Sequence, residues 1–255
     1  MKNTTIAGLD FSVSAKAEFL TGSKNNITRK IFATGGGYDE KTIKYLIALT
    51  GKENPKICFL STPVGDSEAY IAKWFEIAKT LPIQPYVQKV FIASTEQQTP
   101  FEATLLQMDA ILVTGGNTLN AIALWKAQGI DIVLRKAWEK GIVLSGPSAG
   151  SICWFEGGLS DSRPVHLSVV KGLGFLKGSN CPHYNTEKER KPLYLQWIEQ
   201  GKLLPGYACD QTGGLYFENT ELKRVVTQSV DDKAYKVSVV NGKVVETPLA
   251  AELIE

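Results

Sequence analysis

Residues 141–155 constrain the fold of this chain more than any other segment. They open with an apolar run at 142–144, whose length and branched side chains are typical of a buried strand. The chain then turns through Gly-Pro-Ser-Ala-Gly at 146–150 into Ser-Ile-Cys-Trp, which can form the first turns of a helix. The turn matches G-x-S-x-G, the pattern of a nucleophile elbow, in which a serine sits on a sharp strand-to-helix turn. An ordinary glycine-rich loop of an α/β domain is the alternative, since short patterns also match by chance.

Two further glycine-rich loops follow predicted strands. Residues 31–34 lead into three glycines at 35–37, and residues 110–114 lead into Gly-Gly-Asn-Thr at 115–118. In open parallel sheets, ligands bind at the carboxyl ends of the strands, so the three loops are expected to meet at one crevice. The glycines at 35–37, taken alone, are better explained as a tight turn.

Strands and helices alternate along most of the chain, which predicts βαβ units. The expected strands lie at 31–34, 56–61, 84–92, 110–114, 142–144, 206–210 and 213–217, and the helices at 39–50, 67–80, 101–108, 119–128, 132–140 and 186–199. Residues 236–245 form a hairpin around Asn241-Gly242. We therefore predict an α/β fold with a mostly parallel, flavodoxin-like sheet, helices on both faces and a β-rich C-terminal edge. Residues 1–29 are interpreted as an N-terminal extension and 30–255 as a single α/β domain.

Composition and charge exclude several classes of partner. The net charge is only +2, from 28 basic and 26 acidic residues, so no strong field favours nucleic acid or an anionic membrane. No apolar run is long enough to span a bilayer, and no secretory signal pattern is present. The four cysteines contain no C-x-x-C pair and are expected to be reduced thiols, mostly buried. A cytoplasmic location is the resulting prediction, and a homodimer stays an open alternative.

A serine nucleophile needs a base, and the chain has only two histidines. His183 follows a short apolar segment and is expected at a strand end, on the same rim as Ser148, whereas His166 lies in a polar loop. His183 is therefore the predicted base, although a helix-capping or substrate-orienting role is also open. His166 is expected to be a surface residue.

The base needs a third group to orient it, and Asp210, at the end of a predicted strand, is our choice. Glu218 and Asp161 are the other carboxylates considered, and Asp210 could instead cap a turn. The oxyanion needs two preorganised donors. The N–H groups of Ala149 and Gly116 are predicted for this role, and the side-chain amide of Asn117 is expected to reach the substrate.

This ordered set of motifs resembles the peptidase E family, which includes aspartyl dipeptidases and, more distantly, cyanophycinases. The resemblance runs from Ile31 to about Phe217. It implies a fold similar to class I glutamine amidotransferases, with serine in place of cysteine at the elbow. It also implies a serine peptidase with a Ser-His-acid triad that acts on small peptides without metal or cofactor. Ser148, His183, Gly116 and Ala149 match the family's nucleophile, base and oxyanion positions, and Asp210 falls where the acid usually stands.

The sequence departs from the family at several points, including Pro147 in the elbow and Cys181 before Pro-His. Peptidase E grips an N-terminal aspartate with an arginine beyond the histidine, and Arg190 is the candidate here. Its neighbours Glu187 and Glu189 could instead favour a cationic group. We predict a dipeptidase or exopeptidase. A cyanophycinase-like hydrolase of branched peptides, or a binding protein without turnover, are the alternatives.

Overall fold

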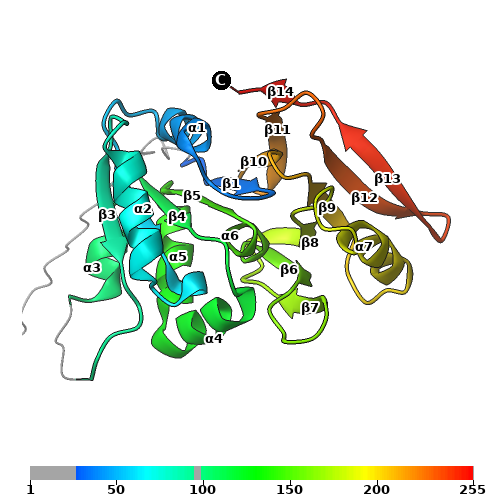
Figure 1. The fold of residues 1–255 in the computed structure, drawn as a ribbon, viewed down its shortest axis with the longest axis horizontal. Coiled ribbons are helices and arrows are strands. Elements are labelled where there is room, and N and C mark those ends of the chain that lie inside the picture. The colour runs from blue at the N-terminus through cyan, green and yellow to red at the C-terminus, as the bar shows by residue number, and fades with distance from the viewer. Residues whose placement is uncertain (1–26, 95–98, 255) are drawn as a thin grey trace, which may run out of the picture.

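Two β-sheets lie side by side in the computed structural model, which describes residues 27–94 and 99–254 (Figure 1). The first sheet has eight strands in the order β14-β11-β10-β1-β5-β4-β2-β3. Its parallel part consists of β1 (Lys30–Thr34), β5 (Val143–Pro147), β4 (Ala110–Val113), β2 (Lys56–Leu60) and β3 (Gln84–Gln88). The C-terminal strands β10 (Gly214–Glu218), β11 (Glu221–Thr227) and β14 (Glu252–Leu253) extend it on one side.

Helices cover both faces of the first sheet, as predicted. Strand residues alternate between the faces, so Phe32 and Phe59 pack on one side while Ile31 and Cys58 pack on the other. The first side is covered by α1 (Glu40–Thr50) and α2 (Glu68–Ala78). The second is covered by α3 (Phe101–Leu105), α4 (Thr118–Gln128) and α5 (Ile130–Glu139). The α/β prediction is confirmed.

The second sheet was not expected from the sequence. Its order is β13-β12-β9-β8-β6-β7, and it lies with α7 toward the right of Figure 1. Its strands are β6 (Phe155–Ser160), β7 (Ser168–Lys171), β8 (Leu176–Cys181), β9 (Gly206–Cys209), β12 (Ala234–Val240) and β13 (Lys243–Leu249). Helix α7 (Arg190–Glu199) packs against it through Tyr194 and Ile198.

Strand β6 shows why sequence patterns missed this sheet. Its residues 156–158 are Glu-Gly-Gly, which suggest a polar loop. In the structure, a Cβ atom on Gly157 would lie 2.6 Å from the carbonyl oxygen of Val170, and one on Gly158 would lie 2.4 Å from that of Asn180. The glycines therefore let the neighbouring strands approach, and the expected polar loop over these residues is wrong.

Local signals placed several boundaries correctly. The side chain of Asp39 caps α1 by accepting from the N–H of Thr42, and Gly51 ends that helix at φ 69°. Asn241 and Gly242 have φ of 51° and 76°, the positive values that a type I′ hairpin needs. Helix α7, however, begins at Arg190 rather than at 186, so the predicted start of this helix is wrong by four residues.

All four cysteines are buried and unpaired. Among the described residues, no helix is both long and apolar enough to cross a membrane. Most of the predicted N-terminal extension, residues 1–26, lies outside the described part of the chain.

Candidate active site

Ser148 is the single residue that links β5 to the short helix α6 (Ala149–Ile152). Its backbone has φ 52° and ψ −112°, a strained conformation for a residue with a side chain. Its side chain is half-buried, so solvent can reach it. Its N–H donates to the carbonyl oxygen of Thr34 at 3.2 Å, which ties the elbow to the end of β1. This is the geometry expected of a nucleophile elbow.

Both glycines of the elbow are required by close backbone contacts. A Cβ atom on Gly146 would lie 2.4 Å from the carbonyl oxygen of Val113 and 2.7 Å from that of Gly150. A Cβ atom on Gly150 would also lie 2.4 Å from the oxygen of Val113. The glycine pattern therefore brings the ends of β4 and β5 together directly beneath the serine.

The loop after β4 lies against the serine. A Cβ atom on Gly115 would be 3.3 Å from Cβ of Ser148, a contact that the sequence did not single out. Gly116 has φ +125°, and a Cβ atom there would lie 2.4 Å from the carbonyl oxygen of Pro63, in the 3₁₀ helix Thr62–Val64. In the turns and loops that the structure describes, the N–H groups of Gly116 and Ala149 have no backbone acceptor. Both groups are therefore available to an oxyanion.

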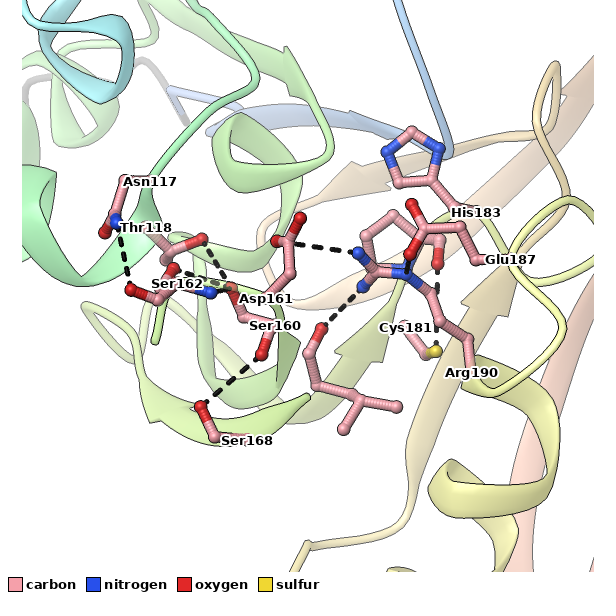
Figure 2. A network of polar contacts seen from close by, with 12 residues as sticks. Asn117, Thr118, Ser160, Asp161, Ser162, Ser168, Cys181, His183, Glu187 and Arg190 are labelled. Atoms are coloured by element: carbon pink, nitrogen blue, oxygen red, sulfur yellow. Dashed lines mark hydrogen bonds and ion pairs between the residues drawn. The ribbon is translucent and has the colours of Figure 1, made fainter. Parts of the chain in front are cut away.

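The side-chain amide of Asn117 makes two hydrogen bonds within the protein. Its Oδ1 accepts from the N–H of Asn120 at 2.9 Å and so caps α4. Its Nδ2 donates to the carbonyl oxygen of Ser162 at 2.9 Å (Figure 2). Each end of the amide therefore makes one hydrogen bond within the protein, and the predicted contact with substrate depends on the second N–H and the second lone pair.

His183 follows β8 and has φ 55°, the second strained residue of the site. Its ring is half-buried, and Nδ1 lies 2.8 Å from Oε1 of Gln211. Oγ1 of Thr186 donates to the same Oε1 at 3.2 Å. The carbonyl oxygen of His183 accepts from the N–H groups of Thr186 and Glu187, at 3.3 and 3.2 Å, so the backbone around the ring is held in a turn.

The expected contact between Asp210 and the imidazole is wrong. Asp210 is 4% exposed, and its Oδ2 accepts from the N–H of Lys233 at 2.8 Å. Its own N–H donates to the carbonyl oxygen of Lys233 at 2.9 Å, so the residue joins the end of β9 to the loop before β12. Burial raises the pKa of its carboxyl group, although the Lys233 N–H opposes this. The next residue, Gln211, occupies the position beside the ring.

The other carboxylates considered also lie elsewhere. Glu218 accepts from the hydroxyl of Tyr216 at 2.8 Å, and Asp161 forms an ion pair with Arg190 at 3.7 Å. The only sequence signal for Gln211 was its place next to Asp210.

The loop after β1 connects the two halves of the site. Thr34 accepts from the N–H of Ser148, and the N–H of Gly35 donates to the carbonyl oxygen of Gly213 at 2.8 Å. A Cβ atom on Gly36 would lie 2.4 Å from Nε2 of Gln211. These contacts bring the elbow and the partner of His183 to the same rim of the first sheet. Among the described residues, no hydrogen bond joins Oγ of Ser148 to the ring of His183.

Arg190 is part of an internal network and is not free to grip a substrate. Its side chain is 1% exposed. Figure 2 shows its guanidinium between Glu187 and Asp161. Nε donates to Glu187 at 2.6 Å, Nη1 donates to the carbonyl oxygen of Leu159 at 2.9 Å, and Nη2 lies 3.7 Å from Asp161. The predicted substrate role of Arg190 is therefore not supported by this conformation. The loop beside this network holds His166, which is exposed as expected.

The part of the chain that the structure describes contains no group of three or more His, Cys, Asp or Glu side chains able to hold a metal ion. The site therefore consists of a serine on an elbow, two unoccupied N–H donors, and a histidine joined to an amide.

Comparison with known proteins places these residues in a family. The model of peptidase family S51 matches residues 31–225. The chain is 40% identical over 232 residues to the uncharacterized peptidase YgaJ of Bacillus subtilis (strain 168), covering 89% of this chain and 99% of that protein.

Two solved structures share the fold at low sequence identity. One is a Listeria monocytogenes EGD-e protein described as a candidate peptidase E. It is 18% identical, with a TM-score of 0.59 over 79% of this chain and 100% of that one. The other is a peptidase from an acI-B1 Actinobacterium. It is 17% identical, with a TM-score of 0.67 over 89% and 96%. The chain therefore belongs to peptidase family S51, the peptidase E family, and is a serine-type peptidase.

Proposed function

We propose that this peptidase is an exopeptidase or dipeptidase that cleaves small peptides with Ser148 as nucleophile and His183 as general base. The observation that carries this proposal is the strained, half-buried Ser148, with the main chain of Gly115 packed against it. This backbone conformation costs free energy for a residue with a side chain, and such strain clusters at sites where the side chain is used.

The proposed reaction follows acyl transfer. Nε2 of His183 takes the proton from Oγ of Ser148 as this oxygen attacks the scissile carbonyl. The N–H groups of Ala149 and Gly116 stabilise the resulting oxyanion. The intermediate expels the amine, which takes the proton from the imidazolium, and water then hydrolyses the acyl-enzyme by the same route. Small adjustments must bring the hydroxyl and the ring into contact, as is common in free enzymes.

The charges near His183 bear on the substrate. Two carboxylates, Asp161 and Glu187, share the single guanidinium of Arg190, which leaves one formal negative charge. Asp161 and Glu187 are partly exposed, with side chains 67% and 43% accessible. These two carboxylates are accessible to the N-terminal ammonium of a substrate, with Arg163 and Lys188 lining the same surface. The pairing of Arg190 does not support its selection of an N-terminal aspartate. Branched peptides with arginine side chains are the second candidate, because they also carry a cationic group.

The test is hydrolysis of a panel of dipeptides and of a branched aspartyl-arginine peptide. Ser148→Ala is expected to reduce kcat by a factor of at least about 10³, since triad serines carry effects of this size. Ser151→Ala is the matched control, because this serine lies one turn along and bonds to Oδ1 of Asn180. An alkyl fluorophosphonate is expected to label the wild type and Ser151→Ala but not Ser148→Ala. Unchanged hydrolysis by Ser148→Ala would contradict the proposal.

A further inference from the structure

The partner of His183 is an amide, and this changes how the base can work. Oε1 of Gln211 lies 2.8 Å from Nδ1. When that oxygen faces the ring, Nδ1 carries the hydrogen and Nε2 keeps its lone pair for the serine proton. When the amide is turned, its NH₂ faces the ring, Nδ1 becomes the acceptor and Nε2 carries the hydrogen. A carboxylate supports only the first state, whereas an amide can support either.

We propose that Gln211 is the positioning residue of this peptidase, in the place where a triad acid would stand, and that Gly36 provides the space that holds its amide. This inference rests on the proposed function. Gln211 itself touches the base and not the reacting atoms, so its effect passes through the tautomer and orientation of His183.

The fit between Gly36 and Gln211 is close. A Cβ atom on Gly36 would lie 2.4 Å from Nε2, and 2.5 Å from both Cδ and Oε1 of Gln211. The amide therefore packs directly on the main chain of Gly36, and any larger residue must displace it. The hydroxyl of Thr186 also donates to Oε1, at 3.2 Å. The backbone of Gln211 is held as well, because its N–H donates to Oδ1 of Asn185 at 3.0 Å.

The charged groups around this loop have other partners. Asp210 and Asp232 accept from main-chain N–H groups at Lys233 and Thr212, each at 2.8 Å. On the helix side, Glu187 bonds to Arg190 at 2.6 Å, and Lys191 bonds to Glu246 at 2.7 Å. In the described structure no carboxylate is bonded to the ring of His183, so the imidazolium formed during the reaction has a neutral partner at Nδ1.

Replacing the amide by a carboxylate should therefore have a specific signature. A carboxylate beside Nδ1 favours the protonated, charged ring. A higher pH is therefore needed before the ring can act as a base. In Gln211→Glu, the acidic limb of the kcat/KM profile is expected to move up by about one pH unit, with most of the activity kept at high pH. Gln84→Glu is the matched control, because it adds the same charge on the exposed far edge of the sheet and should leave the profile in place.

Removing the amide tests the positioning role. Gln211→Ala is expected to reduce kcat by a factor of about 10²–10³ with KM changed less than about threefold, since loss of an orienting partner acts on the base. Gly36→Ala should reduce kcat similarly, because it displaces the same amide. The double variant should then be no worse than the more damaged single variant. Thermal unfolding of each variant shows that it is folded at the assay temperature.

The outcomes separate this inference from the proposed function. If Ser148→Ala loses activity while Gln211→Ala keeps kcat within twofold, the positioning role is wrong and the serine mechanism stands. The positioning role would also be overturned if the pH profile of kcat/KM for Gln211→Glu superimposed on that of the wild type. Additive losses of kcat in the double variant of Gly36 and Gln211 would overturn it as well. If Ser148→Ala is active, the proposed function itself fails.

Discussion

The main chain of Gly115 lies directly against the side chain of Ser148. A Cβ atom on Gly115 would be 3.3 Å from Cβ and 3.9 Å from Oγ of the serine. Gly115 follows β4 and Ser148 follows β5, two neighbouring parallel strands, so the contact is set by their register. The glycine therefore fixes how close the loop with the oxyanion donor can come to the nucleophile.

Gly115→Ala is expected to reduce kcat/KM by about tenfold, because the added methyl group must push the serine or the loop by a few tenths of an ångström. Steady-state kinetics on the best dipeptide measure the effect. Gly51→Ala is the control, since this glycine caps α1 at φ 69° with no side-chain neighbour and its substitution should affect stability alone. Full activity in Gly115→Ala would show that the contact does not shape the site.

Asp210→Asn should preserve catalysis and change the pH dependence of stability. Burial raises the native pKa of this carboxyl above its value in the unfolded chain. Between the two values the unfolded chain binds fewer protons than the native protein, so the free energy of unfolding falls as the pH rises.

An asparagine side chain does not titrate. The free energy of unfolding of Asp210→Asn, relative to that of the wild type, should therefore increase as the pH rises above about 4. Urea unfolding at a series of pH values measures this difference. Because the carboxylate does not contact His183, kcat/KM should stay within about threefold of wild type. A loss of about 10³ or more, as expected for a triad acid, would restore Asp210 to that role.

The thiols should not react in the native protein. Burial raises the pKa of Cys58 and Cys181 to about 12, and it raises the pKa of Cys153 and Cys209 as well. Only the thiolate reacts, and at about pH 8 such a thiol is ionised in about one molecule in ten thousand. Iodoacetamide is expected to leave activity intact, whereas a fluorophosphonate abolishes it. Mass spectrometry of native and urea-treated samples gives the number of alkylated cysteines in each. Alkylation of the native protein with loss of activity would argue against Ser148 as the nucleophile.

Arg190→Met should destabilise the protein without changing its preference for N-terminal residues. The substitution leaves the carbonyl oxygen of Leu159 and the carboxylate of Glu187 without their buried partner. The expected loss is about 2–3 kcal/mol of unfolding free energy, measured in urea. The ratio of kcat/KM for aspartyl and alanyl dipeptides should stay the same, and a selective loss on the aspartyl substrate would show that Arg190 does grip it.

Local sequence signals determined a large part of this molecule. Helix α1 is bounded by Asp39 and Gly51, and the last hairpin turns at Asn241-Gly242. In each case the residues that decide the backbone are themselves in the turn. The G-x-S-x-G pattern likewise identifies Ser148 because its glycines and its strained turn are adjacent in sequence.

Tertiary structure alone decided the second sheet and the partner of the base. The glycines of β6 are strand residues only because Val170 and Asn180 pack closely beside them. Asp210 and Gln211 are neighbours at one strand end, and no local pattern says which of them faces His183. That choice depends on Lys233, which binds Asp210 from a distant segment, and on Gly36, which makes space for the amide. The sequence determined which segments turn and which serine lies on the elbow, whereas contacts between distant strands determined which groups lie beside that serine and beside His183.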